Sequence, residues 1–118
     1  MTVLEIVDWD EHFENEETRE MDVVPFALMP NKMDGDGYTE LMLHDEAARI
    51  FGTWLHIVEI TGKCIPRGLL LRSGLRPHDV ASLARQSRGK KKDFELAIPV
   101  LLDLGWLRYN TIEEHEKR

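Results

Sequence analysis

Residues 77–109 constrain the fold of this chain more than any other stretch. Their apolar side chains recur at spacings of three and four, in two groups, which is typical of amphipathic helices. The residues with this spacing are Val80, Leu83, Ala84, Phe94, Ala97, Ile98, Leu101 and Leu104. Between the groups lies a polar turn with a glycine at residues 86–89, and Gly105 predicts the end of the second helix before a strand at residues 106–109. Helix, turn, helix and strand form the second half of a winged helix.

The residues before and within this stretch complete the pattern. Residues 69–72 predict a short strand that pairs with residues 106–109 across the two helices. Pro77 suits the first position of the first helix, and Asp79 in its first turn favours the helix dipole. Pro99 falls inside the second helix and predicts a kink, because proline removes a backbone hydrogen bond. The sequence therefore predicts a mainly α-helical fold with a small β-sheet, an α+β domain similar to winged helices.

Cations gather around the predicted turn. Arg85 and Arg88 flank it, and Lys90, Lys91 and Lys92 occupy the start of the second helix. Exposed cations at a helix N-terminus oppose the macrodipole at roughly 0.3 to 1 kcal/mol each, so helix stability does not explain them. Binding to a phosphate backbone explains these cations, because the free amides and the lysines then face the same anion. The alternative interpretation is a charged turn that contacts only solvent.

The net charge of −7 is distributed unevenly along the chain. Residues 1–62 carry a charge of −12, residues 63–92 carry +8 and residues 93–118 carry −3. A basic face can bind a polyanion even on an acidic domain, while the acidic remainder limits that binding. Any affinity for DNA is therefore predicted to be weak and dependent on salt.

The first third of the chain predicts little regular structure. Residues 3–9 favour a short strand or an extended arm, because β-branched side chains are frequent there. Residues 10–22 are acidic and form either a solvated surface or a docking surface for a partner protein. Residues 23–30 are apolar and bracketed by prolines, so an extended segment on the core is expected. Together they form an acidic N-terminal extension over about residues 1–37.

A central core helix is predicted over residues 45–60, where a broad apolar stripe returns. Gly52 lies inside it and costs up to about 1 kcal/mol relative to alanine, which predicts that another element crosses closely there. Residues 61–63 end the helix, with Gly62 as the glycine just beyond the last turn.

Motifs for metal binding or catalysis do not occur in the sequence. The Asp-Gly pairs of residues 31–38 are better explained as turns, since neither glycine places ligands at the first and last positions of a calcium loop. His44 and His56 have no second ligand three or four residues away, and Cys64 is the only cysteine. Phosphate-binding loops, nucleophile elbows and His-Glu-x-x-His helices are also missing. We therefore expect no metal, no cofactor and no enzymatic activity.

The length of 118 residues predicts one domain, residues 1–118. No apolar run approaches the ~20 residues of a membrane span, and the first residues are acidic where a signal peptide is basic. A cytoplasmic protein without membrane partners is expected.

Several segments carry a resemblance to a known family. They are Trp9 with the HFEN that follows, VPFALMPNKMDGDGY, Phe51-Gly52-Thr53-Trp54, PRGLL, SLARQSR and FELAIPVLLDLGWL. In these segments the chain resembles small phage and prophage proteins and the N-terminal winged-helix domains of phage replication-initiation (replisome organiser) proteins. The resemblance covers nearly the whole chain and implies DNA binding or replisome assembly. Because the chain stops shortly after the last strand, we expect no helicase-loading or oligomerising region and a short or missing wing.

Two functional hypotheses follow. In the first, the chain is a DNA-binding module in which Arg85, Arg88, Lys90, Lys91 and Lys92 contact phosphates. Ser87 and Lys91 are then the candidates for base edges, and Arg108 is the candidate wing contact. In the second, the acidic N-terminal half docks a protein of a replication or regulatory complex. The sequence indicates no oligomeric state.

Overall fold

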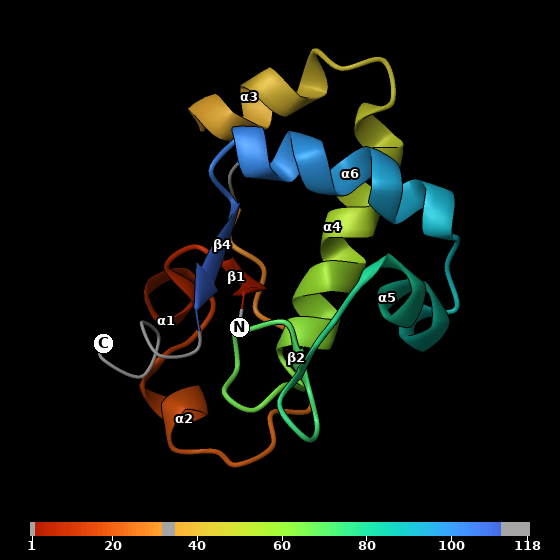
Figure 1. Cartoon of the computed structure of the whole chain (residues 1–118). Helices are drawn as coiled ribbons and strands as arrows, with labels where there is room; N and C mark the ends of the chain where they lie inside the picture. The colour runs from red at the N-terminus through yellow and green to blue at the C-terminus, as the bar shows by residue number, and fades with distance from the viewer. Residues whose placement is uncertain (1, 32–34, 112–118) are drawn as a thin grey trace.

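The computed structural model describes residues 2–31 and 35–111 (Figure 1). Its elements, in chain order, are β1 (Thr2–Ile6), α1 (Trp9–His12), α2 (Glu16–Arg19), α3 (Asp36–Met42), α4 (Ala47–Thr61), β2 (Leu71–Arg72), β3 (Arg76–Pro77), α5 (Val80–Ser87), α6 (Lys91–Asp103) and β4 (Leu107–Thr111). Helices dominate and the strands are short, so the predicted α+β class is confirmed. No helix within the described ranges is long and apolar enough to cross a membrane.

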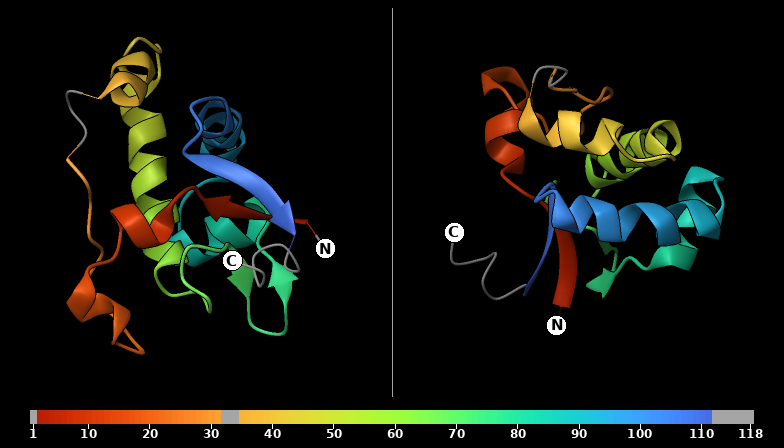
Figure 2. Two further views of the ribbon diagram at one scale, coloured as in Figure 1. Left: turned by 90° about the vertical axis from the view of Figure 1, so that its left-hand side faces the viewer. Right: turned by 90° about the horizontal axis from the view of Figure 1, so that it is seen from above.

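Strands β1 and β4 form an antiparallel pair, with Thr2 opposite Thr111 and Ile6 opposite Leu107 (Figure 2). Residues 68–70 run along the other edge of β1, where the Leu70 N–H donates to the Leu4 carbonyl at 2.8 Å. The predicted pairing of residues 69–72 with residues 106–109 is therefore wrong, because β1 lies between them. The reason is that residues 3–6 are buried on both faces, so this strand takes the centre of the sheet.

A short hairpin of β2 and β3 precedes α5. Pro77 belongs to β3, so its predicted place at the first position of the helix is wrong. Asp79 is the N-cap: its carboxylate accepts from the Ser82 N–H at 2.8 Å, and the Ser82 hydroxyl accepts from the Asp79 N–H at 2.9 Å. This reciprocal pair satisfies two donors at the helix end and starts the helix at Val80.

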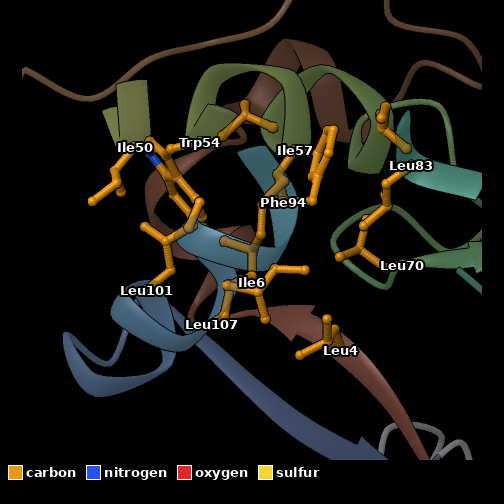
Figure 3. Packing of buried hydrophobic residues seen from close by; sticks show 14 of the residues in the cluster. Leu4, Ile6, Ile50, Trp54, Ile57, Leu70, Leu83, Phe94, Leu101 and Leu107 are labelled. Atoms are coloured by element: carbon orange, nitrogen blue, oxygen red, sulfur yellow. The ribbon is translucent and has the colours of Figure 1, made fainter. Parts of the chain in front are cut away.

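Helix α4 is the predicted central helix and packs against α3, α5 and α6. In Figure 3 its side chains point towards those of α6 and the sheet, and Leu4, Ile6 and Phe13 of the predicted N-terminal extension belong to the same core. The prediction that another element crosses closely at Gly52 is wrong, because a Cβ there would meet nothing within 4 Å. The helix ends at Thr61 with Gly62 next, as predicted, but Gly62 has a right-handed φ of −64° and not the left-handed conformation of a glycine in the C′ position.

Close approaches occur instead at two other glycines. A Cβ on Gly68, which has a φ of 94°, would lie 2.6 Å from the Trp9 Cβ. A Cβ on Gly37 would lie 2.7 Å from the Trp106 Nε1. Glycine at these positions lets two tryptophans pack directly on the backbone. Of the predicted Asp-Gly turns, Asp36 and Gly37 instead begin α3, so the turn predicted there is wrong, and residues 32–34 lie outside the described residues.

Helices α5 and α6 are joined by a turn at residues 88–90 rather than 86–89, because α5 continues through Ser87. Helix α6 runs past Pro99 to Asp103, and the predicted kink stays a prediction. Gly105 has a φ of 77° and the Trp106 N–H donates to the Leu101 carbonyl at 3.1 Å, which confirms the predicted stop. The more specific assignment to winged helices also stays a prediction.

Candidate nucleic-acid interface

The turn between α5 and α6 brings five cations into one short stretch, which we call the cationic turn. Its members are Arg85, Arg88, Lys90, Lys91 and Lys92, and all five are exposed. Arg85 lies in the last turn of α5 and Lys91 is the first residue of α6. Figure 1 shows this connection at the edge of the molecule, away from the β1–β4 pair. The structure therefore places these predicted phosphate contacts on neighbouring, accessible positions.

Backbone geometry fixes the shape of the cationic turn. Arg88 ends α5 in the left-handed conformation, with a φ of 59° and a ψ of 25°. The Gly89 N–H donates to the Ala84 carbonyl at 2.9 Å, which closes the end of the helix. The Ser87 hydroxyl donates to the same carbonyl at 3.3 Å and accepts from the Gly89 N–H at 3.1 Å. Ser87, a predicted base contact, thus bonds to the backbone of its own turn.

The start of α6 has backbone donors but no side-chain cap. Lys90 is the N-cap and has an extended conformation, and its side chain has no acceptor oxygen. The one acid of the first turn, Asp93, accepts from the Arg49 Nε at 2.6 Å. The Asp93 N–H already donates to the Lys90 carbonyl at 3.0 Å, so the amides of Lys91 and Lys92 are the ones available to an external acceptor.

The cationic turn differs from most of the other described arginines, because those arginines form salt bridges. Arg19, Arg49, Arg67 and Arg108 each form an ion pair with an acid, at N–O distances of 2.9, 2.6, 2.7 and 2.5 Å. Among the described residues, no member of the cationic turn forms a salt bridge. Exposed cations without a protein partner keep their full charge for an external anion.

Arg67 shows why the basic stretch of residues 63–92 does not act as one surface. Its Nε donates to a Glu14 oxygen at 2.7 Å, and its other nitrogens donate to the carbonyls of Thr18 and Met21. Burial of Glu14 raises its pKa, but hydrogen bonds from Arg67, Trp9 and Thr18 outweigh burial and hold that pKa below its ordinary value. Arg67 thus joins the acidic N-terminal half to the core and does not extend the cationic turn.

Arg108, the predicted wing contact, lies in β4 and apart from the cationic turn (Figure 1). Its Nε donates to a Glu5 oxygen at 2.5 Å, and the Asn110 amide donates to the same oxygen at 2.9 Å. Glu5 is only 3% exposed, so Arg108 neutralises a buried carboxylate of the sheet. The structure therefore brings together all of the predicted DNA-contacting residues except Arg108.

Sequence analysis did not identify a polar group beside the start of α5. His78 is buried, and its Nδ1 lies 2.9 Å from the Ser82 hydroxyl. Burial lowers the pKa of His78, and the charge of Arg72 lowers it further. Within the described residues, the Arg72 Nε is buried without a hydrogen-bond partner. His78 and Ser82 are neighbours at the helix start, four residues apart, but the place of Arg72 depends on the pairing of β2 with β3, which the sequence does not indicate.

The described residues include one group with the spacing of metal ligands. Ligand atoms of Asp8, Glu11 and His12 lie within 4.8 Å of one another. All three side chains are exposed, and exposed acidic groups often approach one another in this way. This geometry alone does not support a metal site.

Comparisons with known proteins do not assign a function. No protein-family model, curated protein or solved structure matches the chain. The resemblance to phage replication-initiation domains stays a prediction from sequence, and the function is argued from the surface of the molecule.

Proposed function

We propose that the chain is a DNA-binding module that contacts phosphates through the cationic turn. The observation that carries this proposal is the contrast in pairing: five neighbouring cations form no salt bridge in the described part of the chain, whereas four arginines elsewhere do. The resemblance supports a role in phage or prophage replication initiation or regulation. Under this proposal, Arg108 stabilises the sheet and makes no wing contact.

The geometry supports a simple mode of binding. Lys90, Lys91 and Lys92 lie where the free amides of α6 begin, so one phosphate can meet both a backbone N–H and an ammonium group. Arg85 and Arg88 lie on the preceding side of the turn and fit neighbouring phosphates. Lys91 remains the candidate for a base edge. The charge of −12 on residues 1–62 repels a polyanion, so that part of the chain faces away from DNA and the affinity stays low.

The test is a titration of fluorescently labelled duplex DNA at several salt concentrations. Replacing Lys90, Lys91 and Lys92 by alanine should reduce the slope of log affinity against log salt by about 2.7 for duplex DNA, and by about 2 for a single strand. Lys63→Ala is the matched control, because Lys63 is exposed but lies outside the cationic turn. An unchanged slope in the triple variant contradicts the proposal.

Exposed apolar side chains favour a second candidate function, docking of a protein partner on the acidic N-terminal half. Val23 is 81% exposed and Phe26 is 49% exposed, and both follow the acidic helices α1 and α2. Apolar anchors beside negative charge suit a basic, amphipathic partner segment. A labelled lysine- and leucine-rich peptide tests this function: Phe26→Ser should weaken its binding and leave DNA binding unchanged.

A further inference from the structure

A cavity of about 370 Å³ lies at the C-terminal end of α6, the opposite end from the cationic turn. It forms where the end of β1, helices α1, α3 and α4, and the residues after α6 meet. Five aromatic rings and one carboxylate dominate its lining: Phe13, Tyr38, Phe51, Trp54, Trp106 and Asp8. This volume lies in the range of sites that take small molecules.

The aromatic rings support one another in two groups. Trp54 lies between Phe13 and Trp106, with ring centroids 6.1 Å and 5.3 Å away. Tyr38 and Phe51 form a perpendicular pair with centroids 5.6 Å apart. The two groups come from α3, α4, the end of α1 and the turn after α6, so the fold brings them together from distant parts of the sequence. Contacts between rings hold the cavity wall in a fixed arrangement.

The charge at the cavity is negative. Asp8 lines it and is exposed, and the carboxylate of Glu11 lies within 4.8 Å of the Asp8 carboxylate. Within the described residues, no lysine or arginine lines the cavity. A carboxylate at an aromatic wall attracts a cation in two ways, because ring faces also carry negative potential.

We propose that this cavity binds a small organic cation, an ammonium group on a short apolar body. The ammonium group lies near Asp8, and the apolar body contacts the rings of Trp106 and Tyr38. Trp54 and Phe13 are buried and form the wall behind them. The proposal is independent of DNA binding, because the cavity and the cationic turn share no residue.

The probe is choline, and its control is 3,3-dimethylbutan-1-ol, a neutral molecule of nearly the same shape. Binding of either is followed by tryptophan fluorescence, since Trp54 and Trp106 line the cavity. Choline should bind at least about fivefold more tightly than the alcohol, which corresponds to ~1 kcal/mol for a partly exposed cation site. Equal affinity, tighter binding of the alcohol, or no binding of choline would overturn the proposal.

Two variants locate the site. Asp8→Asn should weaken choline binding about fivefold and leave the alcohol unaffected; Asp8 has a φ of 54°, a conformation that asparagine also tolerates. Glu17→Gln is the matched control, because it removes the same charge from an exposed residue outside the cavity. Trp106→Leu should reduce the affinity for choline more than for the alcohol. If Glu17→Gln weakens choline binding as much as Asp8→Asn does, the charge effect is general and the proposed site is wrong.

Discussion

The cationic turn and the two most enclosed ion pairs among the described residues, Arg67–Glu14 and Arg108–Glu5, use charged groups in opposite ways. In the pairs, the acid side chains are only 5% and 4% exposed, and each guanidinium donates to its carboxylate. In the cationic turn all members are exposed, and the described chain offers them no salt bridge. A buried carboxylate requires a partner, whereas an exposed ammonium group is stabilised by water alone. The comparison teaches that the charge of a stretch does not reveal how much of it is available for binding.

The strongest test of this comparison removes Arg67. Arg67→Met should lower the free energy of unfolding by about 3 kcal/mol, because it leaves the buried Glu14 carboxylate without its guanidinium. Arg85→Met is the matched control and should change that free energy by less than about 0.5 kcal/mol. Urea unfolding followed by tryptophan fluorescence measures both. If both variants lose the same unfolding free energy, the enclosed ion pair and the cationic turn do not differ in their contribution to stability.

Arg108 should show a smaller effect of the same kind. Arg108→Met is expected to cost about 1 to 2 kcal/mol of unfolding free energy, since Glu5 keeps its hydrogen bond from Asn110 and the Arg108 side chain is 39% exposed. The salt dependence of DNA binding should not change. If Arg108→Met reduces the salt slope of DNA binding, Arg108 contacts DNA, and the proposal that it only stabilises the sheet is wrong.

The pKa of Glu14 predicts how the stabilisation by the Arg67–Glu14 pair depends on pH. The folded-state pKa of Glu14 lies below its ordinary value of 4.5, so the unfolded chain takes up its proton first as pH falls. The stabilisation from Glu14 is therefore complete above pH 4.5 and is lost as pH falls through the lower, folded-state pKa. In Arg67→Met, burial favours the protonated acid and only the hydrogen bonds from Trp9 and Thr18 still oppose it, so the pKa of Glu14 should rise and the destabilisation by this variant should shrink as the solution is acidified. Unfolding curves between neutral pH and pH 3 test this expectation; a constant difference would contradict it.

The smallest expected effect concerns Arg88. Its left-handed backbone, with a φ of 59°, suits glycine better than arginine. Arg88→Gly should therefore raise the unfolding free energy by about 0.5 kcal/mol, while the salt slope of DNA binding falls by about 0.9. Stability and binding would then change in opposite directions at one residue. Weaker binding with lower stability would instead indicate that the variant disturbs the turn.

Sequence patterns predicted the local features of this fold and missed most of the long-range ones. The apolar spacing of α4, α5 and α6 and the stop at Gly105 were recognisable because helices and their caps depend on neighbouring residues. The pairing of residues 69–72 was predicted wrongly, because strand order depends on which segment is buried on both faces.

The candidate site shows the same difference between local features, which were predicted, and long-range features, which were not. Six of its seven predicted residues lie close together because they are close in sequence, whereas Arg108 lies in the last strand, forms an ion pair with Glu5, and its predicted wing contact stays a prediction. The ion pairs of Arg67 and Arg108 join positions 53 and 103 residues apart, and no local pattern indicates them. The aromatic cavity was missed for the same reason, since its rings come from separate parts of the chain and no local pattern brings them together.

The central position of β1 has a consequence for how the protein is made. Residues 2–6 leave the ribosome early, yet their hydrogen-bonding partner, residues 107–111, is translated last of all the described elements. Such a distant closure slows folding, and until then the nascent chain carries an apolar strand with one edge open, because residues 68–70 pair only with its other edge. Chaperones that hold nascent chains should therefore matter for the yield of this fold.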